Sequence, residues 1–145
     1  MTTMPDNSRR IYDHAFRDNG LKETSGPKST PRIRAAIHAA ATWLDEDDSQ
    51  TAWCGCIRGL WGMETGTGVP PQHYRAASWA KWGKPVRWVD VKPGDTVVMQ
   101  RPGGNHVALY VRHDDLHVWC YGGNQANACN VSKFKRALVT ALRRG

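Results

Sequence analysis

Cys54 is the residue in this sequence that is best placed to act as a nucleophile. Ile57, Leu60 and Trp61 recur at steps of three and four residues, a spacing that predicts a buried helix beginning at about Cys54. A helix N-terminus lowers the pKa of a thiol, and its unpaired N–H groups can hold the oxyanion that forms when a thiolate attacks a carbonyl. Cys54 is therefore a candidate for acyl chemistry, against the alternative of an inert buried cysteine.

His106 is the candidate base for that thiol. It follows a glycine-rich turn at 101–105 and opens an apolar, β-branched run at 106–111 that predicts a strand. A base at the edge of a strand can face a cleft while the strand fixes its position. The alternative is a structural or solvent-exposed histidine, which we expect for the remaining histidines: His14, His38, His73, His113 and His117.

A polar pair can orient the imidazole. Asn124 and Gln125 follow a Gly-Gly pair at 122–123, which we expect to end the next strand. If the two strands form a hairpin, His106 and Asn124 lie at the same end of the sheet. An amide there can accept a hydrogen bond from the imidazole and set its tautomer, as in a Cys-His-polar triad. The alternative is an ordinary turn whose residues suit the backbone.

The elements that must position these side chains follow an α+β pattern. Apolar spacing predicts helices at residues 8–17, 32–44, from 54 onward and 74–82. The second half predicts strands at residues 89–91, 96–99, 106–111, 116–121, 131–134 and 137–142. Helices followed by an antiparallel sheet define an α+β fold. The length suits one domain over 21–145 with a helical extension at 1–20.

The charge and hydropathy of the chain restrict its partners. A net charge of +7 attracts polyanions, such as nucleic acid or an anionic bacterial envelope. The basic residues are scattered and form no known nucleic-acid motif, so we expect no nucleic-acid partner. No apolar run is long enough for a signal peptide or a membrane helix, so we expect synthesis in the cytoplasm without membrane insertion.

The remaining cysteines do not form a recognisable metal site. Cys54 and Cys56 are a C-x-C pair, Cys120 and Cys129 are too far apart for C-x-x-C, and no H-E-x-x-H motif occurs. Cys56 lies two residues further along the predicted helix and points to a different face. We therefore expect no metal, and we interpret Cys56, Cys120 and Cys129 as packing residues.

Taken in order, four motifs resemble the NlpC/P60 and CHAP superfamily. They are Trp-Cys at 53–54, Pro-Gly-Asp-Thr-Val-Val at 93–98, Asn-His-Val-Ala-Leu-Tyr at 105–110 and Gly-Gly-Asn-Gln at 122–125. The chain is more closely similar to a small phage-associated branch with a GGNQ element. That branch also carries motifs like those at 21–26 and 78–83, and a basic C-terminal end. The resemblance covers roughly residues 20–145.

The resemblance implies a papain-like α+β fold and cleavage of an amide bond of the peptidoglycan stem peptide, by an amidase or an endopeptidase. Its catalytic cysteine and histidine map onto Cys54 and His106, with Asn105 in place of the usual glycine. The third polar residue maps onto Asn124, with Gln125 next in line. Asp95 takes a structural position in the turn before a strand. Neither a metal nor a cofactor is implied.

We further expect three side chains to contact the substrate: Trp53, Trp79 and Gln125. The favoured interpretation is a monomeric, endolysin-like peptidoglycan hydrolase that is released from the cytoplasm and acts on the cell wall. The alternatives are a secreted antibacterial amidase effector with an immunity partner, a non-enzymatic cell-wall-binding module, and a basic nucleic-acid-binding protein.

Overall fold

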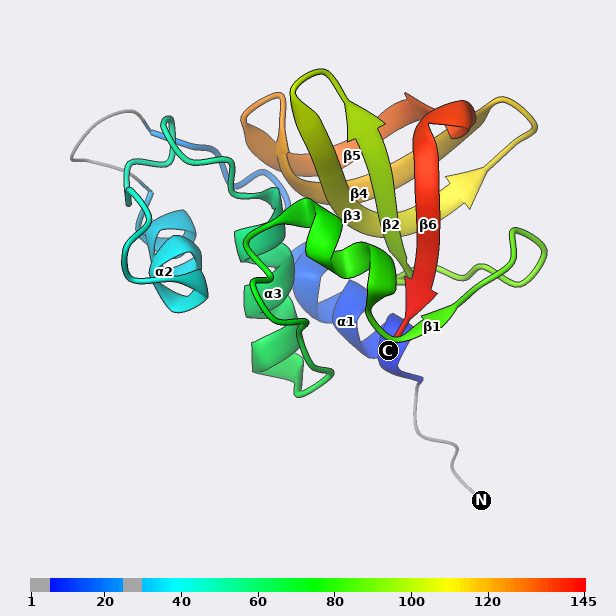
Figure 1. The fold of residues 1–145 in the computed structure, drawn as a ribbon, viewed down its shortest axis with the longest axis horizontal. Coiled ribbons are helices and arrows are strands. Elements are labelled where there is room, and N and C mark those ends of the chain that lie inside the picture. The colour runs from blue at the N-terminus through cyan, green and yellow to red at the C-terminus, as the bar shows by residue number, and fades with distance from the viewer. Residues whose placement is uncertain (1–5, 25–29) are drawn as a thin grey trace.

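A computed structural model describes residues 6–24 and 30–145. It has an α+β fold in which a layer of helices packs beside one curved antiparallel sheet (Figure 1). The helical elements come first along the chain, with one short exception between the last strands: α1 (Asn7–Ala15), η1 (Phe16–Asp18), α2 (Pro31–Ala40), α3 (Cys54–Thr65), η3 (Ala76–Lys81) and η4 (Arg136–Leu138). None of the helices in this part of the chain is long and apolar enough to span a membrane.

The sheet has six strands in the order β1-β6-β2-β3-β4-β5, and every neighbouring pair is antiparallel. Their bounds are β1 (Lys84–Pro85), β2 (Thr96–Arg101), β3 (Gly104–His113), β4 (His117–Gln125), β5 (Ala128–Lys135) and β6 (Val139–Arg144). The chain crosses from the β5 edge through η4, so that β6 pairs with β2 and β1. The predicted hairpin that brings the 106–111 and 116–121 segments together is confirmed as β3 and β4.

The side chains of β3 point alternately into two apolar layers, one on each face of the sheet. Leu109 packs with Ile57 and Trp61 of α3, in a core that also takes side chains from α1 and α2. Ala108 and Tyr110 point to the opposite face of the sheet, where a second apolar cluster lies. Helix α1 therefore belongs to the main core, and residues 6–20 are an integral part of the fold rather than an appended extension.

Several element boundaries differ from the sequence prediction. Residues 89–91 form no strand: they lie in or beside a turn in which Val89 is 81% exposed, and the edge strand β1 lies upstream of them. The helix expected at 32–44 ends at Ala40. The Gly-Gly pair at 122–123 does not end its strand, since β4 continues to Gln125 with an irregular register. Residues 1–5, together with Ser25 and Gly26 of the motif at 21–26, lie outside the described residues.

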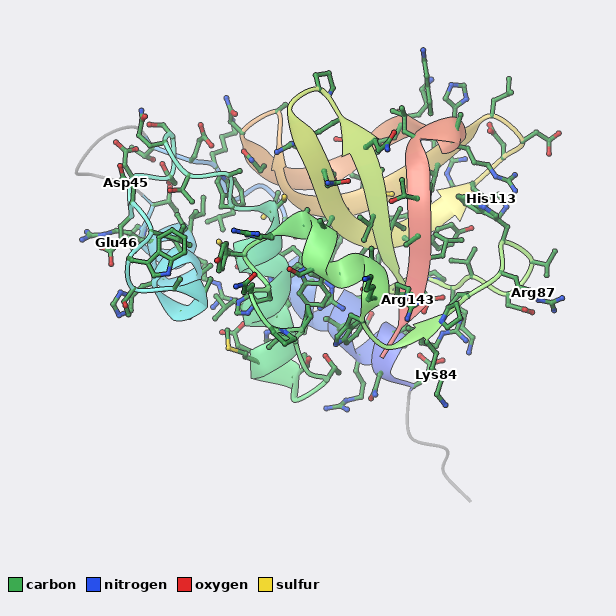
Figure 2. The ribbon with its side chains drawn as sticks, in the orientation of Figure 1. Asp45, Glu46, Lys84, Arg87, His113 and Arg143 are labelled. Carbon is green, nitrogen blue, oxygen red and sulfur yellow. The ribbon has the colours of Figure 1, made fainter. Side chains whose placement is uncertain are left out.

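Charged side chains are distributed unevenly over the molecule. Asp45 and Glu46 lie beside α2 at one end, whereas Lys84, Arg87 and Arg143 lie at the other end around β1 and β6 (Figure 2). Glu46 is paired with Arg34 and His38, which reduces the net charge of its surroundings.

Asp95 joins the helical layer to the sheet. Its buried carboxylate accepts hydrogen bonds from the Ser8 hydroxyl of α1 at 2.5 Å and from the Lys92 N–H at 2.8 Å. The guanidinium of Arg144 on β6 donates two further bonds, at 2.8 and 2.7 Å. Gly94 has a φ of +92°, and a side chain there would collide with the Ser8 backbone. These contacts confirm the structural role expected for Asp95.

Replacing Asp95 by alanine should destabilise the fold by about 3 kcal/mol, because Arg144 would lose its buried partner and Ser8 its acceptor. Chemical denaturation of the purified variant measures the change. The control is Asp90→Ala, which removes the exposed ion pair with Arg87 and should have little effect. Equal stability of the two variants would contradict the assigned role of Asp95.

Candidate active site

Cys54 is the first residue of α3. Trp53 occupies the N-cap position and its side chain makes no capping hydrogen bond, so the first-turn N–H groups have no side-chain cap. A side chain at Gly55 would approach the carbonyl oxygens of His73 and Tyr74 to 2.6 and 2.7 Å. Glycine at this position therefore allows the 73–74 backbone to lie against the first turn of the helix. The Cys54 thiol is held beside N–H groups that can stabilise a negative charge.

The pKa of Cys54 is lowered although the side chain is only 3% exposed. Burial alone would raise this pKa, but a side-chain interaction with His106 and the positive charge that its ring carries once it has accepted the thiol proton more than offset that effect. The Val107 N–H and the charge of Arg101 act in the same direction. Because a thiolate is the reactive form, this environment favours Cys54 as a nucleophile.

The other three cysteines have raised rather than lowered pKa values. Burial raises the pKa of Cys56 to about 12, assisted by the negative charge of a Cys54 thiolate. Burial also raises the pKa of Cys129 to about 12 and that of Cys120 further still. These thiols stay protonated at neutral pH, which agrees with a packing role.

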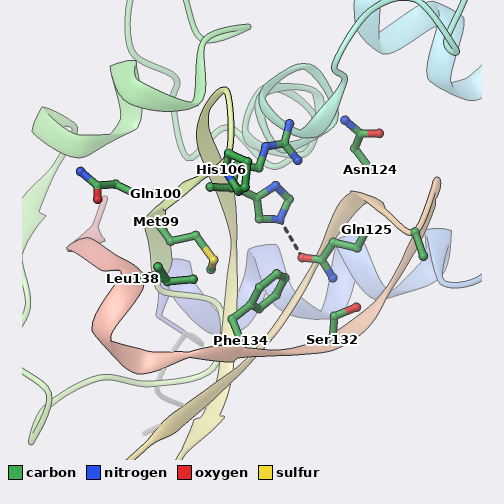
Figure 3. A pocket seen from close by; sticks show the side chains of 11 residues that line it. Met99, Gln100, His106, Asn124, Gln125, Ser132, Phe134 and Leu138 are labelled. Carbon is green, nitrogen blue, oxygen red and sulfur yellow. Dashed lines mark hydrogen bonds between the residues drawn. The ribbon is translucent and has the colours of Figure 1, made fainter.

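Gln125, rather than Asn124, orients the imidazole. Its Oε1 lies 2.9 Å from His106 Nε2, in a buried contact at the end of β4 (Figure 3). Its Nε2 donates to the carbonyl oxygens of Cys120 at 3.2 Å and Asn130 at 2.7 Å, so Oε1 is the atom left to accept. His106 Nε2 must therefore carry the proton. The buried Nδ1, which has no well-formed hydrogen bond, is left with its lone pair for the thiol.

Two polar residues of β5 hold Gln125 in this orientation. The Asn130 side chain accepts a bond from Gln125 Nε2 at 3.2 Å and donates to the Gln125 carbonyl at 2.8 Å. Ser132 donates to Asn130 Oδ1 at 2.6 Å. Sequence reasoning missed Asn130 and Ser132, and only their position on a strand after the GGNQ motif could have indicated them.

In the structure Gln125, and not Asn124, is hydrogen-bonded to His106, although Asn124 is the residue predicted for that position, and a backbone irregularity is the reason. Regular alternation along β4 would turn Asn124 and Gly122 toward the face of Ala108, and Gln125 away from it. Asn124 instead has a φ of +58°, and the pairing of β4 with β5 shifts between Gly122 and Gln125. This bulge reverses the alternation and points Gln125 at His106. Asn124 remains at the rim of the adjoining pocket.

Each of the two glycines of the GGNQ motif leaves room for a different neighbour, so a side chain is excluded at each position for a different reason. A side chain at Gly123 would collide with the Trp53 ring and with Ile57 at 2.4 to 2.7 Å, so this glycine lets β4 approach the start of α3. A side chain at Gly122 would reach Ala108 at 2.8 Å and Gln125 Oε1 at 3.1 Å. Gly122 thus leaves room for the Gln125 amide, and both glycines bring β4 close to Cys54.

Trp53 and Trp79 were expected to contact substrate, but both side chains are fully buried. The Trp53 indole donates to Glu23 Oε2 at 2.9 Å and packs near Gly123. These contacts anchor the backbone that directly precedes Cys54. The Trp79 indole donates to the His73 carbonyl at 3.0 Å and covers the buried guanidinium of Arg58 at 4.3 Å. Burial lowers the pKa of Arg58 to about 9.

An open pocket of about 520 Å³ adjoins the His106–Gln125 pair. Its walls come from the β2–β3 turn, the β4–β5 turn and the segment of β5 and η4 that passes below them (Figure 3). The Phe134 ring lies against the imidazole in a tilted arrangement, with ring centroids 5.6 Å apart. The pocket gives a substrate access to the imidazole side of the site.

Within residues 6–24 and 30–145, no group of three or more His, Cys, Asp or Glu side chains could hold a metal ion. The arrangement contains an activated thiol, an oriented base and uncapped N–H groups, which together suit nucleophilic attack on an acyl carbon. A scan against models of known protein families finds no match, and a search of curated proteins finds no similar sequence.

Alkylation by iodoacetamide should show the lowered pKa of Cys54. We expect the pH midpoint of labelling to fall below about 8.5, the value of a free thiol, and to rise in His106→Ala, because burial is then opposed only by the Val107 N–H and the charge of Arg101. Mass spectrometry of the labelled protein follows the reaction at each pH.

The Cys54→Ser variant is the control for this labelling, since the raised pKa values of the remaining thiols keep them protonated. An unchanged midpoint in His106→Ala would show that the imidazole does not activate Cys54.

Proposed function

We propose that this protein is a cysteine hydrolase that cleaves an amide bond of the peptidoglycan stem peptide. The observation that carries the proposal is the linked set of Cys54, His106 and Gln125: a thiol of lowered pKa at a helix N-terminus, beside an imidazole whose tautomer is set by an amide. This set has the parts of a thiol-based acyl-transfer site.

The mechanism follows from the tautomer. His106 Nδ1 takes the proton of Cys54, and the thiolate attacks the amide carbonyl to form a tetrahedral oxyanion near the first-turn N–H groups of α3. The C–N bond then breaks, and Nδ1 returns its proton to the leaving amine. In the second half, Nδ1 accepts a proton from water, the hydroxide attacks the thioester, and the released thiolate regains that proton. Gln125 accepts from Nε2–H throughout and stabilises the imidazolium.

The choice of peptidoglycan rests on the resemblance to the NlpC/P60 and CHAP superfamily. A helix that begins with the cysteine, followed by an antiparallel sheet with the histidine and a polar residue on successive strands, is the order that a papain-like fold of this superfamily implies. The net charge of +7 would help to hold the protein at an anionic cell wall. On this proposal it acts as an endolysin-like monomer after release from the cytoplasm.

The Cys54→Ala variant should lose all hydrolysis of purified peptidoglycan while it keeps its fold, because no other thiol is activated. Mass spectrometry of the wild-type products, which identifies the new amine and carboxyl ends, distinguishes an amidase from an endopeptidase. Circular dichroism checks the fold of the variant. Cys56→Ala is the matched control, and full activity of Cys54→Ala would exclude the mechanism.

Gln125→Ala should lower kcat by about 100-fold or more, because the imidazole loses the acceptor that sets its tautomer. Asn124→Gly should stay within about threefold of the wild type, since glycine adopts the positive φ of this position without strain. Initial rates on a soluble stem peptide measure both variants. The reverse ranking would return the orienting role to Asn124.

A further inference from the structure

Arg101 is a cation at the edge of the active site, and no carboxylate of the described residues is paired with it. It is the last residue of β2 and lines the 520 Å³ pocket together with His106 and Gln125. Its guanidinium has no hydrogen bond or ion pair with any residue in the described part of the chain. Most other arginines of the sheet and helices are paired or packed on aromatic rings, as Arg144 and Arg112 are. Arg101 is therefore free to bind an external anion.

The rest of the pocket contains no opposing charge. Its walls are largely apolar, from Met99, Pro102, Phe134 and Leu138, and none of its described lining residues is acidic. Pockets of this kind bind the body of a small molecule by apolar contact and fix its orientation with a few polar groups. A guanidinium offers paired N–H donors that match both oxygens of a carboxylate. The chemistry of the pocket thus suits a carboxylate carried on an apolar or compact group.

The position of the pocket decides which part of a substrate it receives. His106 and Gln125 line it, whereas Cys54 does not. In the mechanism above, the acyl part of the substrate bonds to Cys54, and the amine that departs must lie beside the imidazole that protonates it. The pocket therefore lies on the leaving-group side of the scissile amide.

We propose that this pocket is the leaving-group subsite and that Arg101 binds a free carboxylate on the amino acid or short peptide released as the amine. This inference rests on the proposed amide hydrolysis and goes further, because it assigns a substrate feature and a specificity-determining residue. Substrates whose leaving group carries a carboxylate near the new amine are preferred over those in which that carboxylate is amidated.

Binding tests the subsite without turnover. The probes are D-alanyl-D-alanine and its C-terminal amide, titrated into 15N-labelled Cys54→Ala protein and followed by NMR. We expect the free acid to bind about tenfold or more tightly than the amide, with a shift of the Arg101 Nε–H signal. In Cys54→Ala combined with Arg101→Gln, the two probes should bind equally. Arg112→Gln, which removes an arginine outside the pocket, is the matched control and should keep the preference.

Turnover gives the second test. With stem peptides that differ only in a carboxylate or carboxamide on the leaving group, Arg101→Gln should raise KM about tenfold for the carboxylate form and change KM far less for the carboxamide form. The assay is run at a pH at which Cys54 is fully ionised in both proteins, because the charge of Arg101 also contributes to the lowered pKa of the thiol.

The outcomes separate the two proposals. If the wild type cleaves no stem peptide, the proposed function fails, and the binding experiment still decides the role of Arg101. If the wild type cleaves but Arg101→Gln keeps the same preference for the free carboxylate, the subsite assignment is wrong. Equal binding of the acid and the amide to the parent protein would overturn it as well.

Discussion

The hydrogen bond between Gln125 Oε1 and His106 Nε2 is the contact on which the proposed chemistry depends. At 2.9 Å and fully buried, it fixes which ring nitrogen carries the proton and leaves the other for Cys54. A buried thiol without such a neighbour is inert, as the raised pKa values of Cys56 and Cys129 illustrate. The difference between a packing cysteine and a candidate nucleophile is therefore electrostatic, and it comes from one oriented imidazole.

That contact in turn depends on the β-bulge in β4. A regular β4 would direct Gln125 to the wrong face, and the left-handed backbone of Asn124 corrects this. Asn130 then fixes the amide so that its oxygen faces the imidazole. Asparagine tolerates a positive φ better than most residues, so Asn124 contributes through its backbone conformation while Gln125 makes the contact.

The helical layer holds the thiol against this part of the sheet. Trp53 and Trp79 fill the space around the start of α3, and Asp95 joins α1 to β6 at the end of β2 opposite the pocket. These side chains are buried and do not line the open pocket, whose walls come largely from the β2–β3 turn and the β4–β5 turn. The parts of the chain that determine access are therefore turns supported by a rigid core, and Arg101 is the last β2 residue before one of them.

The sequence by itself determined the α+β order of elements, the helix that begins at Cys54 and the hairpin that contains His106, because apolar periodicity and turn residues are local signals. It also narrowed the orienting group to two adjacent amides. Only the tertiary structure decided between them, since the bulge at Asn124 arises from pairing with β5, which no local pattern reveals. The burial of Trp53 and Trp79 was decided in the same way, because an aromatic residue has the same sequence signature whether it lies in a core or along a groove.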